Sequence, residues 1–155
     1  MKPILNITLL LVMFLSPLFG HADGKDRDEW FREMLELKHD YLAKELALTK
    51  EQQQKFFPVY DSMENETRRM FDQTRALEKR VCQKGDKATD AELLKATDAM
   101  YNVKTREAQI ERKYYTQFRK LLSPRQLFKL KRAERHFQRQ MVKEHYKKRP
   151  RKPNK

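Results

Sequence analysis

The chain has 155 residues, of which 37% are charged and 39% hydrophobic, and its formal net charge at pH 7 is +13. This length suggests one small domain. The single cysteine, Cys82, excludes an internal disulfide, so the thiol either bonds to a second chain or stays free.

The first 22 residues have the pattern of a secretory signal peptide. Lys2 precedes an apolar stretch over residues 4–19, and the small residues Gly20 and Ala22 follow it. The apolar stretch is short for a bilayer span, which needs about 20 residues; an uncleaved signal anchor is the alternative. We expect export to the periplasm and cleavage after Ala22.

The remainder predicts an all-α fold. Gly occurs only three times, alternating β-branched residues are absent, and Lys, Arg and Glu favour helices. We expect a first helix over about residues 26–47. A second helix should extend from residue 50 to about 82, with apolar residues at spacings of 4 and 3 from Phe56 to Val81.

A polar turn around Gly85 should lead to a third helix that ends near Leu122, and a fourth should continue to about Tyr146. The seam of the third helix should consist of Ala96, Met100, Val103, Glu107, Ile110 and Tyr114. The second and third helices then form a long antiparallel hairpin. Residues 147–155 carry two prolines and dense positive charge, which indicates a disordered basic tail. The predicted boundaries are 1–22 for the signal peptide, 23–146 for the helical domain and 147–155 for the tail.

The same five-residue pattern begins the second helix and the fourth. In each copy a leucine precedes a hydroxyl residue, and a glutamine follows the hydroxyl by three positions. This is the spacing of a capping box, in which the hydroxyl and the glutamine each accept a backbone N–H of the first turn. The structural motif residues are Leu48, Thr49, Gln52, Leu122, Ser123 and Gln126. A third box, with Glu in place of Gln, starts at Thr89.

The long hairpin has narrow apolar seams, and a thin hairpin buries little apolar surface per residue. We therefore expect part of this surface to be shared with a second copy in an antiparallel homodimer.

Catalytic and metal motifs are not apparent. The sequence has no Gly-rich phosphate loop, no nucleophile elbow and no HExxH, and Cys82 has no nearby histidine, so we do not expect an enzyme. Met141 and His145 are four residues apart and could offer two ligands to a soft metal, but four closely spaced zinc ligands are missing. We predict no metal site and no cofactor.

Basic residues interleaved with methionine and aromatic residues are the strongest functional signal. Such charge attracts acidic polypeptide or anionic lipid, and flexible Met side chains adapt to varied apolar partners; solubility alone is the simplest alternative. An exported protein seldom meets nucleic acid. The candidate client-binding residues are Arg68, Arg69, Met70, Arg75, Lys79, Arg80, Met100, Lys104, Arg106 and Arg112.

With its two LTxxQ-like boxes about 75 residues apart behind a signal peptide, the chain resembles the Spy/CpxP family of periplasmic stress proteins. The resemblance covers about residues 26–146, and the second box has Ser123 in place of Thr. It implies a cradle-shaped antiparallel homodimer, and either ATP-independent chaperoning of unfolded envelope proteins or restraint of a sensor kinase. Related members sense metals through a His-rich segment, which this sequence lacks.

The leading hypothesis is thus an ATP-independent periplasmic chaperone or envelope-stress adaptor. One alternative is a regulatory protein that docks on a sensor kinase or senses a metal. Another is a protein that binds anionic membrane surfaces through its basic tail.

Overall fold

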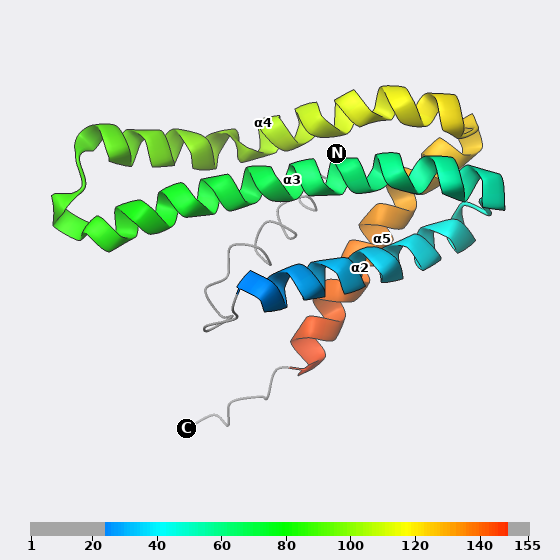
Figure 1. Cartoon of the computed structure of the whole chain (residues 1–155), viewed down its shortest axis with the longest axis horizontal. Helices are drawn as coiled ribbons and strands as arrows, with labels where there is room; N and C mark the ends of the chain where they lie inside the picture. Colours follow the sequence, from blue (N-terminus) through cyan, green and yellow to red (C-terminus); the bar gives the residue numbers. More distant parts are fainter. Residues whose placement is uncertain (1–23, 149–155) are drawn as a thin grey trace, which may run out of the picture. The chain divides into compact units, whose positions relative to one another are not determined.

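The computed structural model describes residues 24–148, so the predicted signal peptide and the tail from residue 149 onward lie outside the described residues. Regular structure within this range is entirely helical, which confirms the all-α prediction with four α-helices. They are α2 (Gly24–Glu45), α3 (Lys50–Lys84), α4 (Asp90–Leu121) and α5 (Pro124–Lys148), with the 3-10 turn η1 (Gly85–Lys87) between α3 and α4 (Figure 1). None of these described helices is long and apolar enough to cross a membrane.

The chain divides into two compact units. One unit is the hairpin of residues 54–121, formed by most of α3 and all of α4. The other joins the segment up to Gln53, which contains α2, to the segment from Leu122 onward, which contains α5.

The hairpin has a core of aromatic and aliphatic side chains along the facing sides of α3 and α4, which lie side by side and antiparallel (Figure 1). Near the start of α3, the Phe56 ring lies 5.1 Å from the Phe118 ring and 5.3 Å from the Tyr60 ring, between centroids. Met63, Met70 and Thr74 are also buried on α3, and they occupy positions of the predicted seam.

The α4 seam differs from the prediction at Met100, which is 47% exposed. Ala96, Val103 and Ile110 are all buried and are spaced by seven residues, so they form one row toward α3. Each residue of an α-helix is turned by about 100° from the last. Met100 therefore lies at the edge of the row, where solvent reaches it.

The second unit packs α2 against α5. Leu42 of α2 and Leu46, directly after this helix, are almost fully buried, as are Leu130 and Phe137 of α5. Where the two helices meet, the centroid of the Tyr41 ring of α2 lies 5.5 Å from the centroid of the Phe137 ring of α5. These apolar residues recur at helical spacing on each element, and their burial is the main source of stability in this unit.

All three predicted capping boxes are present. Gln52 N–H donates to Thr49 Oγ1 (3.1 Å) and Thr49 N–H donates to Gln52 Oε1 (3.2 Å). Ser123 and Gln126 make the same reciprocal pair at 3.3 and 3.0 Å, and Pro124 opens α5. Thr89 and Glu92 form the third box at 3.3 and 3.1 Å. Each box satisfies two backbone donors at a helix start.

The glutamines of the two repeated boxes also bind one another. Gln52 Nε2 donates to Gln126 Oε1, and Gln126 Nε2 donates to Gln52 Oε1, both at 3.0 Å. Gln126 Nε2 further donates to the Leu46 carbonyl at the end of α2 (3.3 Å). In the third box the carboxylate of Glu92 takes the place of the glutamine, and a carboxylate can only accept hydrogen bonds. An amide can accept from the N–H of its own cap residue and also donate to a second side chain. This pair explains why both repeated boxes use glutamine.

Helix α2 ends in a Schellman motif whose left-handed residue is not glycine. Leu48 N–H donates to the Ala43 carbonyl (3.0 Å) and Ala47 N–H to the Lys44 carbonyl (3.1 Å), while Ala47 has a φ of +49°. A Cβ in this conformation is strained by roughly 1–2 kcal/mol. Leu48, the next residue, is buried and fixes the turn toward α3.

Candidate functional site

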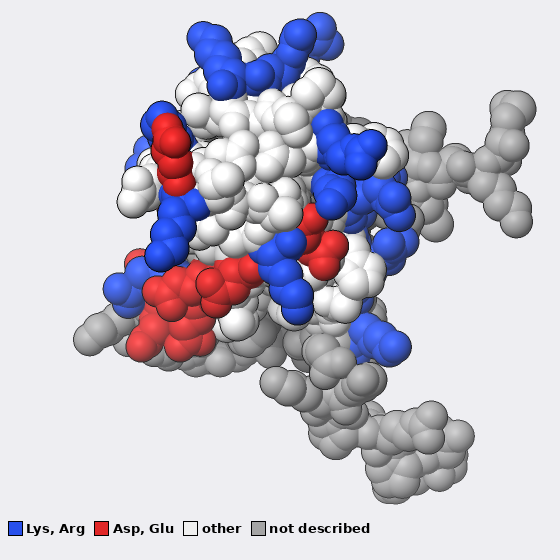
Figure 2. Space-filling view, turned by 90° about the vertical axis from the view of Figure 1, so that its right-hand side faces the viewer, with Lys and Arg blue, Asp and Glu red and all other residues white. Residues whose placement is uncertain are grey.

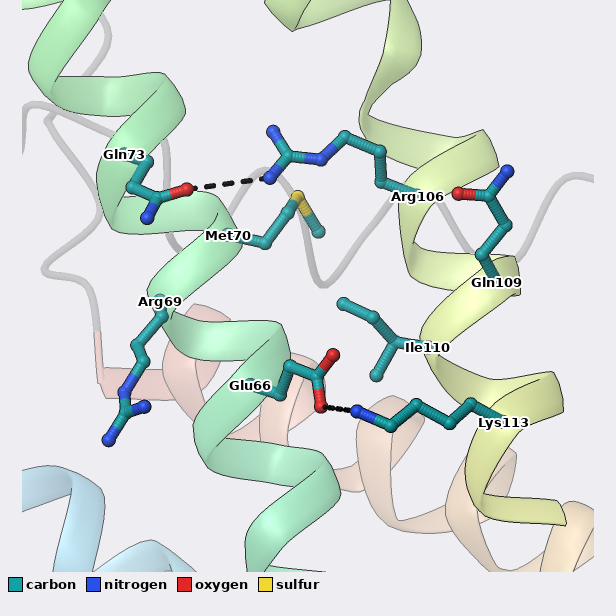
Figure 3. Close-up of a pocket in the computed structure, with 8 residues that line it drawn as sticks. All are labelled: Glu66, Arg69, Met70, Gln73, Arg106, Gln109, Ile110 and Lys113. Carbon is teal, nitrogen blue, oxygen red and sulfur yellow. Dashed lines mark hydrogen bonds and ion pairs between the residues drawn. The ribbon is translucent and has the colours of Figure 1, made fainter. Parts of the chain in front are cut away.

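A hollow of about 400 Å³ opens on one flank of the hairpin, between α3 and α4 (Figure 3). One turn after another of each helix contributes to it, because residues three or four apart share a helix face. The lining residues are Glu66, Arg69, Met70 and Gln73 of α3, and Arg106, Gln109, Ile110 and Lys113 of α4.

The floor of the hollow is apolar and its rim is polar. Met70 and Ile110 are both buried and their side chains face one another across the space between the helices (Figure 3). Arg69 and Gln109 stand at the two outer edges and point away from the centre (Figure 3). Because Met is flexible and polarisable, this floor can adapt to apolar groups of different shape.

Glu66 links the two helices at one end of the hollow. Its Oε2 accepts hydrogen bonds from Lys113 Nζ (2.6 Å) and from the Tyr114 hydroxyl (2.9 Å). The bond from Lys113, with that from Tyr114, holds the pKa of the Glu66 carboxyl below its usual value. The same bond raises the pKa of Lys113, while burial and then Glu66 raise the pKa of Tyr114. Glu66 and Lys113 therefore remain an ion pair across the neutral pH range.

At the other end, Arg106 reaches across the hollow and donates to Gln73 Oε1 at 3.4 Å. Its partner is a neutral amide, so its charge is not cancelled. Arg69, Arg106 and Lys113 together outweigh the one carboxylate, Glu66, and leave the lining with a formal charge of +2. An apolar floor with this positive rim suits a ligand that carries both an apolar group and a carboxylate.

The structure brings together three of the ten candidate client-binding residues: Arg69, Met70 and Arg106 line the hollow. Arg68 is turned about 100° from Arg69, and its Nε lies 3.7 Å from the Asp72 carboxylate. Helical periodicity puts Arg75 and Lys79 on the side of α3 that carries Arg68. The remaining four candidates do not line the hollow either; they are Arg80 on α3 and Met100, Lys104 and Arg112 on α4, all exposed.

Five lining residues were not singled out as candidates from the sequence: Glu66, Gln73, Gln109, Ile110 and Lys113. Ile110 was predicted as core, and it is buried. The other four are polar. Glu66, Gln73 and Gln109 are an acid and two amides, which an excess of positive charge does not indicate, and Lys113 is basic but was not among the ten candidates. Their spacing of three and four residues, on two helices predicted to pair, is the signal that could have found them.

The other residues weighed for special chemistry are dispersed. Cys82 is exposed near the end of α3. His136 Nδ1 lies 2.8 Å from the Tyr41 hydroxyl, and the side chain of His145 is outside the described residues. Across the described part of the chain, no group of three or more His, Cys, Asp or Glu side chains is placed to hold a metal ion.

Charge is not uniform over the surface. On the face drawn in Figure 2, Lys and Arg side chains form several groups around uncharged surface, whereas Asp and Glu gather mainly in one group.

Compared with known proteins, the chain matches no family model, no curated protein and no solved structure.

Proposed function

We propose that this protein is an ATP-independent periplasmic chaperone or envelope-stress adaptor of the Spy/CpxP type, which binds unfolded or partly folded proteins on its α3–α4 hairpin. The observation that carries the proposal is the hollow with its buried apolar floor and its rim of three cations. The LTxxQ-like boxes support the family assignment, since they are formed as capping boxes and their glutamines pair.

Binding would proceed in two stages. The positive rim attracts acidic segments of a client and speeds their encounter. An apolar client side chain then contacts Met70 and Ile110, while a neighbouring carboxylate meets Arg69 or Arg106. The volume of about 400 Å³ suits one or two side chains. Weak capture at many segments, without a fixed sequence, is what an adaptable chaperone surface requires.

The proposal includes an antiparallel homodimer with a cradle-like surface. Support comes from large apolar side chains left in solvent on α4: Tyr101 is 84% exposed, and Leu93, Leu94 and Tyr115 are also exposed. Leu94, Tyr101 and Tyr115 fall at multiples of seven residues, the spacing of a helix–helix seam. A second copy would cover this seam.

The direct test is suppression of aggregation by the purified protein, residues 23–155, without any nucleotide. Light scattering of several unfolding acidic clients measures it, at low and at high salt. We expect suppression at substoichiometric or equal ratios, weakening as salt shortens the screening length from about 10 Å at 0.1 M to about 3 Å at 1 M.

A matched pair of variants tests the hollow itself. Arg69→Gln with Arg106→Gln removes two rim cations and keeps the Glu66–Lys113 pair, whereas Lys104→Gln with Arg112→Gln removes the same charge from other sides of α4. Exposed charge interactions are each worth up to about 1 kcal/mol, so the rim double variant should need about five-fold more protein for half suppression. Equal loss in both double variants, or no suppression by the unaltered protein, would refute the proposal.

A further inference from the structure

Helix α5 has two opposite faces of different chemistry. One face buries Leu130, Ala133 and Phe137. The opposite face, here called the basic stripe, is exposed along its whole length. The stripe consists of Arg125, Phe128, Arg132, Arg135, Arg139 and Lys143.

The residues of the basic stripe are spaced by 3, 4, 3, 4 and 4 positions, so they follow one side of the helix. At about 1.5 Å per residue, the stripe is roughly 27 Å long. No acidic residue interrupts it. The acids of α5 are Glu134 and Glu144, and Glu134 is turned toward Lys131, whose Nζ lies 3.9 Å from its carboxylate.

Phe128 is the one apolar member of the basic stripe, and it is 65% exposed. The Arg132 guanidinium lies 5.8 Å from the centre of its ring. An aromatic ring flanked by arginines is typical of the boundary between lipid headgroups and acyl chains, where the ring enters the boundary and the cations meet the phosphates.

We propose that the basic stripe of α5 docks on the anionic surface of a lipid bilayer, with α5 parallel to the bilayer plane and Phe128 at headgroup depth. This docking does not involve the hollow on α3 and α4 and does not require the basic tail. The charge is complementary: five cations in a straight row face a plane whose phosphates can move to meet each of them.

A lipid surface fits the basic stripe better than a nucleic acid does. Reading of base edges relies on Asn and Gln as well as Arg, and the stripe has neither amide. Single-stranded nucleic acid is held by several aromatic rings in succession, whereas the stripe has one. A row of cations with one aromatic anchor is sufficient for peripheral adsorption to anionic headgroups.

Co-sedimentation with vesicles tests the proposal, using the protein of residues 23–155. The vesicles contain either 30% phosphatidylglycerol in phosphatidylcholine or phosphatidylcholine alone. We expect binding only to the anionic vesicles, lost at high salt. A basic residue near an anionic bilayer is worth about five-fold in partitioning, so Arg132→Gln, Arg135→Gln and Arg139→Gln together should weaken binding on the order of a hundredfold.

Three controls decide whether the basic stripe is responsible. Lys87→Gln, Lys95→Gln and Lys104→Gln remove the same charge from exposed positions elsewhere and should leave most of the binding. Deletion of residues 149–155 should weaken it only in part, and Phe128→Ala should lower it several-fold with little change in salt dependence. Circular dichroism should be unchanged in all variants, since these side chains are exposed.

The proposal is overturned if the two triple variants lose binding equally, because net charge alone would then explain it. It is also overturned if the tail deletion abolishes binding while the stripe triple variant retains it. Binding of a single-stranded oligonucleotide in preference to the anionic vesicles would assign the basic stripe to nucleic acid instead.

Discussion

The paired amides of Gln52 and Gln126 should couple the two repeated capping boxes energetically. The test is a double-mutant cycle with Gln52→Ala, Gln126→Ala and the double variant. Each single substitution removes both bonds of the pair, at 3.0 Å each, as well as the bond from the residue's own cap N–H. The double variant loses the pair only once, so the cycle isolates it.

The magnitude follows from the bonds that the cycle isolates. A hydrogen bond contributes a net 0.5–1.5 kcal/mol, and the pair contains two partly buried ones. The expected coupling is therefore about 1–3 kcal/mol. Each single variant should cost about 2–4 kcal/mol, because it loses the pair and weakens a capping box worth about 1 kcal/mol.

Urea unfolding followed by tryptophan fluorescence suits this measurement. Trp30 is the only tryptophan of the chain and belongs to α2, in the unit that contains both glutamines. A control cycle pairs Gln52→Ala with Glu92→Ala, whose box shares no hydrogen bond with Gln52, and should be additive within about 0.5 kcal/mol. A Gln52–Gln126 coupling below about 0.5 kcal/mol would refute the idea that the pair joins the two boxes.

Three further predictions concern local stability. Ala47→Gly should stabilise the protein by about 1 kcal/mol, because glycine has no Cβ to be strained at this positive φ. As a control, Ala76→Gly, at an exposed position in the interior of α3, should destabilise the protein by about 0.5–1 kcal/mol. If both substitutions shift the urea midpoint in the same direction, the strain at Ala47 is not the reason. Phe118→Ala should cost about 3–5 kcal/mol through the cavity it leaves in the aromatic cluster, measured by circular dichroism, and a cost below 1 kcal/mol would show that the cluster is not a core. The partners of Glu66 lower the pKa of its carboxyl. The bond to Lys113 should therefore stabilise the hairpin fully at pH values above the ordinary carboxyl pKa of about 4.3, and this stabilisation should be lost as the pH falls further. Glu66→Gln should flatten that part of the stability–pH profile, and an unchanged profile would contradict the assignment.

Much of the fold could be predicted because its signals are local. A hydroxyl followed three residues later by Gln or Glu determines where α3, α4 and α5 begin, and apolar residues at spacings of three and four determine which sides of the hairpin are buried. The helix ends agree with prediction to about two residues for this reason.

The non-local features could not be predicted in the same way. The spacing of a capping box shows that Gln52 accepts from Thr49, but it does not show that its amide meets Gln126, 74 residues away. The left-handed turn at Ala47 was not recognised because its residue is not glycine.

The candidate site was predicted only in part, since the prediction rested on positive charge. Arg69, Met70 and Arg106 line the hollow as predicted candidates, but Arg68 and Lys104, predicted with them, lie on other sides of their helices. Glu66 was passed over because its bond to Lys113 across the two helices depends on the register of α3 against α4, which periodicity alone does not give.

The central claim is that unfolded acidic clients bind over the hollow between α3 and α4. Photo-crosslinking tests it most directly, with a photoreactive amino acid in place of Gln109, at the outer edge of the hollow, or of Lys104, exposed on another side of α4. Without nucleotide, an unfolding client should form adducts at position 109 and few at position 104, and high salt should reduce them. Equal adducts at both positions, or none at 109 while aggregation is still suppressed, would contradict the claim.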